Sequence, residues 1–67
     1  MQITVNGEAR EVPADLSLEQ LLVDLKIPGR EGVAVALNLR VVRRQERQGL
    51  QLSEGDRIDI VTAVGGG

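Results

Sequence analysis

One stripe of leucines, set among short segments of β character, most constrains what this chain can form. Leu18, Leu21, Leu22 and Leu25 recur at the i, i+3, i+4, i+7 spacing of an amphipathic helix. A single helix with one apolar face has to bury that face against something else, and the other apolar segments are strand-like. The sequence therefore predicts an α+β domain in which one main helix packs on one sheet.

Local signals mark both ends of this helix. Ser17 has the residue type preferred at the N-cap, and Gln20, three residues later, is placed to complete a capping box. Pro28 disfavours helical geometry in the residue before it, so we expect the helix to end near Leu25 or Lys26.

A hairpin is predicted at the start of the chain. Residues 2–5 and 9–12 form two strand-like segments, separated by Asn6-Gly7. Asn-Gly is the strongest short hairpin signal, because a type I′ turn needs positive φ at both central positions. The apolar residues of the first segment should face the core.

Three further strands are expected after the helix. A loop at 28–32 leads into a continuous apolar run at 33–37, which suits a strand covered by the helix, and a short strand follows at 40–42. The polar segment 43–49 can form one or two helical turns before its glycine. The clean alternation at 57–61 predicts the last long strand, which gives the order ββαβββ.

This order predicts the topology of the sheet. The first hairpin is antiparallel, and the helix is long enough as a crossover for the last strand to lie beside the first. A mixed sheet of four to five strands around one helix is the β-grasp, or ubiquitin-like, roll. It leaves one sheet face uncovered as a natural docking surface. We assign residues 1–64 to this domain and 65–67 to a tail.

The composition excludes several kinds of site. The 67 residues include no Cys and no His, so the chain can form neither a disulfide nor a zinc site built on thiolate or imidazole. There is no aromatic residue, so the core must be aliphatic. The acidic residues Glu54, Asp56 and Asp59 are better explained as a capped turn than as a metal site. We expect no metal and no intrinsic cofactor.

Charge and hydropathy restrict the partners and the location. A formal net charge of −2 is opposite in sign to that of proteins that neutralise phosphates, and single-stranded nucleic acid would find no aromatic platform to stack on. The chain has neither a secretory signal pattern nor a run approaching ~18 apolar residues. We therefore expect a cytoplasmic protein without a nucleic-acid or membrane partner.

Three glycines follow the last apolar segment. Gly65-Gly66-Gly67 can extend roughly 10 Å at about 3.3–3.6 Å per residue, and glycine is slim and free to take either sign of φ. Such a tail can carry a terminal carboxylate into a narrow channel of a partner, whereas a frayed chain end is the simpler explanation. We predict a flexible tail, with the carboxyl group of Gly67 as the reactive group and Gly65 and Gly66 as its route of access.

These segments and the tail together resemble a known family. They are similar to ThiS, the sulfur-carrier family of thiamine biosynthesis, in the leucine helix and in the segments 2–7, 33–38, 55–60 and 63–67. The resemblance covers essentially the whole chain, and the tail is its most specific part. The chain departs from the family at Leu39, where glycine is common, and at Arg43 and Arg47, where the family commonly has a proline and then an aromatic residue.

The resemblance implies a carrier that is a co-substrate of other enzymes. Family chemistry, placed on Gly67, begins with adenylation by an activating enzyme of the ubiquitin-activating type, which uses ATP and Mg. Sulfur from a donor protein then gives a C-terminal thiocarboxylate, which donates its sulfur to thiazole synthase. The residues agree with a non-enzymatic role, because a chain without His or Cys lacks the usual base or thiol of nucleophilic catalysis.

Other functions remain open from the sequence. The small subunit of molybdopterin synthase has the same fold and chemistry, but its members are usually longer and carry aromatic and proline residues where this chain has residues 60–63. A protein modifier conjugated through Gly67 to lysines is a second alternative. A ubiquitin-like interaction module with an incidental tail is a third.

Several residues are candidates for docking to partners. Arg43, Arg44 and Arg47 belong to an arginine cluster, which is either a solvated surface or a basic patch that orients the carrier on an acidic rim of a partner. Val61 is expected on the uncovered sheet face. Val64 is expected either to anchor the tail or to line the channel of the partner.

Overall fold

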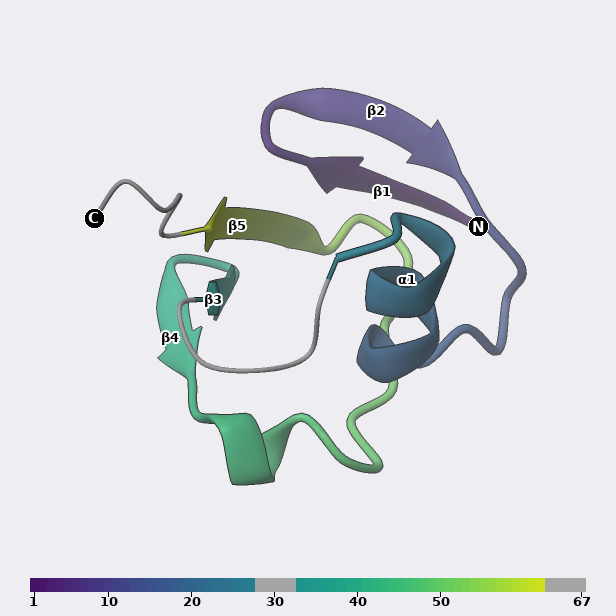
Figure 1. Ribbon diagram of the computed structural model, residues 1–67. Helices are drawn as coiled ribbons and strands as arrows, with labels where there is room; N and C mark the ends of the chain where they lie inside the picture. Colours follow the sequence, from purple (N-terminus) through teal and green to yellow (C-terminus); the bar gives the residue numbers. More distant parts are fainter. Residues whose placement is uncertain (28–32, 63–67) are drawn as a thin grey trace.

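A five-stranded mixed sheet wraps around one helix (Figure 1). A computed structural model describes residues 1–27 and 33–62, with only the backbone of Thr62. The elements are β1 (Gln2–Val5), β2 (Glu8–Glu11), α1 (Leu18–Asp24), β3 (Val33–Leu37), β4 (Arg40–Val42), the short 3₁₀ helix η1 (Arg44–Glu46) and β5 (Arg57–Thr62). The predicted order ββαβββ and the β-grasp roll are confirmed. The loop predicted at 28–32 and the tail predicted at 65–67 lie outside the described residues.

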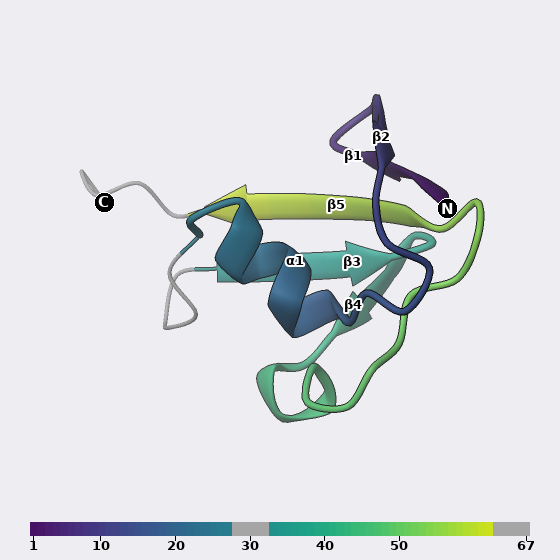
Figure 2. The same ribbon diagram turned by 90° about the vertical axis from the view of Figure 1, so that its right-hand side faces the viewer.

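The last strand occupies the centre of the sheet. The strand order is β2-β1-β5-β3-β4, and β5 is parallel to β1 and antiparallel to β3. The expectation that the last strand lies beside the first is therefore confirmed. Helix α1 covers one face of this sheet and leaves the other open (Figure 2). No helix in the described part of the chain is long and apolar enough to cross a membrane.

The turn of the first hairpin also extends the pairing of β1 with β5. Asn6 and Gly7 have φ of 50° and 86°, as the predicted turn requires. The Asn6 backbone N–H donates to the Ile58 carbonyl at 2.9 Å. The Ile60 N–H donates to the Asn6 side-chain Oδ1 at 2.7 Å. A backbone carbonyl would accept this bond in a continuing parallel ladder, so the side-chain oxygen replaces it where the β1 backbone has turned away.

Helix α1 begins and ends where its sequence predicts. The Ser17 Oγ accepts a hydrogen bond from the Gln20 backbone N–H at 3.1 Å, which confirms Ser17 as the N-cap. The reciprocal half of the predicted capping box is wrong. The Gln20 side chain instead donates to Asp24, one helical turn further on, at 3.0 Å. The helix is capped at Leu25, and Lys26 turns the chain with a φ of 60°.

The core is aliphatic, as the composition requires. Both inward residues of β1, the first three leucines of the helical stripe and the inward isoleucines of β5 are buried, and Leu25 is half-buried. The largest fully buried side chains are Ile3, Leu18, Leu21, Ile58 and Val35. These residues come from both halves of the sheet and from the helix. Burial of one connected cluster therefore fixes β5 between β1 and β3.

The turn between β3 and β4 has the same backbone signs as the first hairpin. Asn38 and Leu39 have φ of 52° and 70°, although position 39 is not glycine. The side chain of Asn38 is held from both sides. It accepts a bond from the Arg57 N–H at 2.9 Å and donates one to Asp56 at 3.1 Å. Leu39 itself is 74% exposed, so its left-handed backbone is not offset by burial.

Candidate functional site

The candidate site begins where β5 ends. Thr62, the last described residue, pairs with Val33 at the start of β3, and Ile60 is held on the other side by the Asn6 oxygen. The described end of β5 is therefore held on both flanks, by its pairing with β3 on one side and by the Asn6 oxygen on the other. The predicted site residues Val64, Gly65, Gly66 and Gly67 lie outside the described residues.

An apolar patch on the open sheet face lies next to this point. Residues directly opposite each other on antiparallel strands share a face, and the register places Val61 opposite Ala34 and Val41 opposite Ala36. Val61 and Val41 are 66% and 70% exposed. We call these four residues the outer patch. Val61 was predicted to be exposed on this face, whereas Val41 was not singled out, because its strand is too short to show alternation.

Charged residues border the outer patch. On β5, Arg57 donates from Nε to Asp59 at 2.9 Å, in a partly exposed ion pair beside Ala36. The other predicted acids serve the preceding turn. Asp56 accepts from the Ser53 N–H at 2.7 Å, and Glu54 accepts from the Gln2 N–H at 3.1 Å. The capped turn is confirmed, and the described residues contain no cluster able to hold a metal ion.

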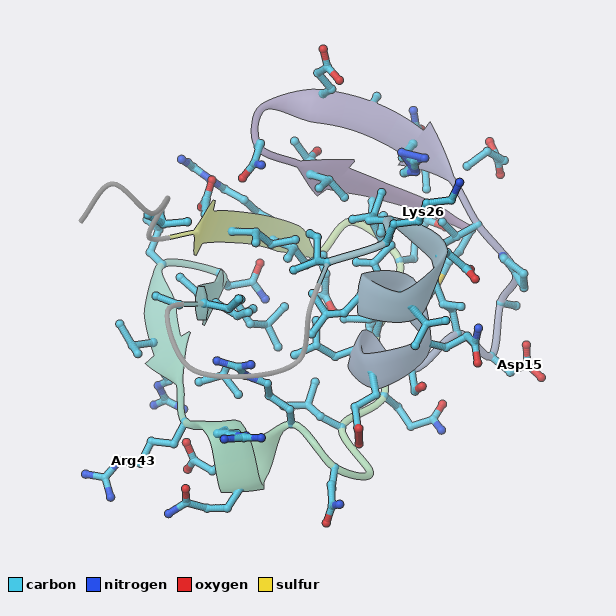
Figure 3. All side chains as sticks on the ribbon, in the orientation of Figure 1. Asp15, Lys26 and Arg43 are labelled. Atoms are coloured by element: carbon cyan, nitrogen blue, oxygen red, sulfur yellow. The ribbon has the colours of Figure 1, made fainter. Side chains whose placement is uncertain are left out.

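The three candidate arginines do not form one exposed surface. Arg43 extends away from the domain (Figure 3), and Arg44 is also exposed. Arg47 is buried, at 7% exposure, and its Nη2 donates to the Val33 carbonyl at 2.9 Å. The expectation of a shared solvent-facing patch is therefore wrong for Arg47. Its burial depends on a carbonyl from a distant strand, which the local sequence does not reveal.

The family of the chain is decided by a match along nearly all of its length. The model of the ThiS family matches residues 3–67. The chain belongs to the ThiS family. The match includes the positions at which this chain departs from common ThiS residues, and it runs through the glycine segment.

Solved ThiS structures share this fold. The crystal structure of the thiamine biosynthesis protein ThiS from Geobacter metallireducens is 33% identical to this chain, with a TM-score of 0.82 and complete coverage of both chains. The solution structure of a thiamine biosynthesis protein from the same organism gives a TM-score of 0.81, over 100% of this chain and 88% of that one. The β-grasp arrangement is therefore that of ThiS.

Two curated relatives contain a ThiS-like segment within a longer protein. The thiazole synthases of Paramagnetospirillum magneticum and Magnetococcus marinus are 36% and 40% identical to this chain over 67 residues. The chain spans only 20% of the length of each relative. A segment similar to this chain is thus part of polypeptides named thiazole synthase.

Proposed function

We propose that this ThiS-family chain carries sulfur for the thiazole ring of thiamine, on the carboxyl group of Gly67. The observation that carries the proposal is the family match, which continues through the glycine segment to residue 67. The likeness to a solved thiamine biosynthesis protein over the entire chain supports it. In this role the chain is a carrier and co-substrate rather than an enzyme.

The carboxylate has to be activated before it can accept sulfur. With a reference pKa of about 3.3–3.7 an α-carboxyl group is ionised at neutral pH and is a poor acyl donor. In the proposed sequence an oxygen of Gly67 attacks the α-phosphorus of ATP on an activating enzyme, and pyrophosphate leaves. Sulfur from a donor protein then displaces AMP at the acyl carbon to give the thiocarboxylate. ATP and Mg belong to the partner, and the role of this chain is to present a slim tail.

The acceptor of the sulfur is proposed to be thiazole synthase. The curated relatives support this pairing, because a segment similar to this chain and the thiazole synthase name occur in the same polypeptide. Gly65 and Gly66 are proposed to give Gly67 access to the active sites of both enzymes, since no side chain widens the tail there. Val64 is proposed to line the entrance to those sites.

The outer patch is proposed to dock the carrier on its partners. Val61 and Val41 are large, exposed apolar side chains on one face, close to the end of β5. An apolar centre with a charged rim is the usual anatomy of a protein interface. The Arg57–Asp59 pair supplies part of that rim. Arg43 and Arg44 remain available for steering, because they are exposed.

Sulfur loading can be followed by intact mass. The chain is incubated with the activating enzyme, ATP and a sulfur donor, and the expected product gains the mass of an oxygen-to-sulfur exchange in its C-terminal peptide only. A chain lacking Gly67 should fold normally and gain nothing. Loading of that shortened chain would refute the mechanism. Cells lacking the chain should require thiamine for growth, and only the full-length form should remove that requirement. This result distinguishes the thiamine route from the molybdopterin route.

Docking through the outer patch is tested with a matched pair of variants. Val61→Asp places a charge within the patch and should slow loading about tenfold, which corresponds to about 1.4 kcal/mol of interface energy. Ala9→Asp introduces the same charge on edge strand β2, which β1 separates from β5, and should load like the parent. Equal rates for the two variants would remove the outer patch from the interface.

A further inference from the structure

A groove separates α1 from η1, on the side of the sheet opposite the outer patch. In both ribbon views η1, the green turn after β4, lies beside the helix rather than on the open sheet face (Figures 1 and 2). The groove has a volume of about 460 Å³, within the range of roughly 300–1,000 Å³ that is usual for binding sites. Apart from Arg44, which is proposed above for steering, none of its lining residues has a role in the proposed sulfur transfer.

The α1 wall of the groove is apolar. It consists of Leu22, Val23 and Ile27. Leu22 is buried, Ile27 is half-buried, and Val23 is 66% exposed, as exposed as the docking candidate Val61. Glu19 closes this wall at its N-terminal end. The wall therefore offers contact to an aliphatic side chain, and its Glu19 end repels anions.

The η1 wall is rich in hydrogen-bond donors. It carries Arg44 and Arg47, together with the side-chain amides of Gln45 and Gln48. Among the described residues that line it, two arginines stand against the carboxylate of Glu19, so this part of the groove is cationic in a chain whose net charge is −2. Its charge thus opposes that of the molecule as a whole, which favours a negatively charged occupant.

Arg47 gives this wall a fixed anchor. Its side chain is more than nine-tenths buried, and one of its five N–H groups is occupied by the Val33 carbonyl. Within residues 1–27 and 33–62, its Nε has no hydrogen-bond partner and no carboxylate lies within ion-pair distance. No counter-ion from the described residues offsets the cost of burying this guanidinium, and a carboxylate from outside would reduce that cost.

We propose that this groove binds an acidic segment of a partner protein, with an aliphatic side chain on the α1 wall and a carboxylate on Arg44 and Arg47. The two walls together select for that combination, because neither a purely apolar nor a purely anionic ligand satisfies both. A bidentate arginine–carboxylate contact fixes the direction of the segment as well as its position. The groove and the outer patch are on opposite sides of the sheet, so both can be occupied at once. The inference does not depend on the sulfur chemistry.

The test measures binding of a short fluorescent peptide of alternating leucine and glutamate by anisotropy, with a leucine–glutamine peptide as the neutral counterpart. The glutamate peptide should bind and the glutamine peptide should bind at least about tenfold more weakly. In nuclear magnetic resonance titrations the amides of Val23, Gln45 and Gln48 should shift, and those of Val41 and Val61 should not.

Two matched pairs of variants locate the binding. Arg44→Glu should weaken binding of the glutamate peptide about tenfold. Arg10→Glu makes the same charge change on edge strand β2 and should leave the affinity within about twofold of the parent. Val23→Asp should weaken binding and Val61→Asp should not, although the two valines are equally exposed at 66%. All four residues are on the surface, so each variant should retain the fold.

Each remaining outcome would overturn the inference. Equal losses for Arg44→Glu and Arg10→Glu would reduce the effect to overall charge. Shifts confined to the outer patch would place the peptide elsewhere. Stronger binding in Glu31→Gln would identify the carboxylate of residue 31 as the resident counter-ion, and a concentration-dependent dimer dispersed by the peptide would make a second copy the occupant. Intact sulfur loading alongside lost peptide specificity would refute this inference alone.

Discussion

Replacing Asn6 by alanine removes the side-chain oxygen that holds the C-terminal half of β5 on the side that faces β1. The Asn6 Oδ1 accepts the Ile60 N–H at 2.7 Å, in the position where a backbone carbonyl would continue the ladder. Alanine cannot accept this bond. It also lacks the tolerance of asparagine for a φ of 50°.

The expected loss has two parts. A partly buried backbone N–H left without an acceptor costs about 1–3 kcal/mol, and alanine in the left-handed region adds roughly 1 kcal/mol. The sum is about 2–4 kcal/mol. A domain of this length has a free energy of unfolding of roughly 3–10 kcal/mol, so Asn6→Ala should lose a large share of it and lower Tm by about 10–25 °C.

Two further substitutions at this position separate the parts. Asn6→Gly relaxes the backbone and still removes the acceptor, so it should cost about 1–3 kcal/mol. Asn6→Asp keeps an oxygen in place and should remain within about 1 kcal/mol of the parent. Denaturant unfolding gives the energies, and hydrogen exchange of the Ile60 amide reports on the bond itself. If Asn6→Gly matched the parent in stability and the Ile60 amide stayed protected, the Asn6 side chain would not have the proposed role of replacing a backbone acceptor in the ladder.

Two other substitutions test local features of the fold. Leu39→Gly should stabilise the protein by about 0.5–1 kcal/mol in denaturant unfolding, because it relieves a left-handed leucine that is 74% exposed, less the entropy cost of glycine; a loss of stability would show that Leu39 makes contacts worth more than its strain. Ser17→Ala should cost about 1 kcal/mol by removing the N-cap acceptor of α1, whereas Ser53→Ala in the exposed turn should change stability by less than about 0.5 kcal/mol. Equal effects of the two serine variants would argue against the cap.

Local signals in the sequence predict most of the elements. Asn6-Gly7 predicts its own hairpin because only a few residue types accept positive φ, and Ser17 predicts the helix start because its side chain bonds to its own chain three residues on. The alternation of β5 predicts its inward residues, Ile58 and Ile60, because successive side chains of a strand point to opposite faces of the sheet. Each of these patterns is complete within one segment.

Features that depend on two distant segments could not be predicted in the same way. The burial of Arg47 requires the Val33 carbonyl, and the exposure of Val41 requires its register with Ala36. The Gln20 side chain is a local exception: two partners are within its reach along the helix, and it bonds to Asp24 instead of completing the capping box. The left-handed Leu39 is imposed by the hairpin, since strands that already pair dictate the turn between them.

The central position of β5 also determines when the sheet can form during synthesis. β1 and β5 come from opposite ends of the sequence, and they pair in parallel at Thr4–Arg57 and Val5–Ile58. Contacts so distant along the chain form slowly, because the closure of a long loop must precede them. Until β5 has emerged from the ribosome, the facing edges of β1 and β3 have no partner and are open to misassociation. The strand that closes the domain precedes the glycine segment by only two residues in the sequence, so the sheet can be completed only when synthesis has come close to the proposed reactive end.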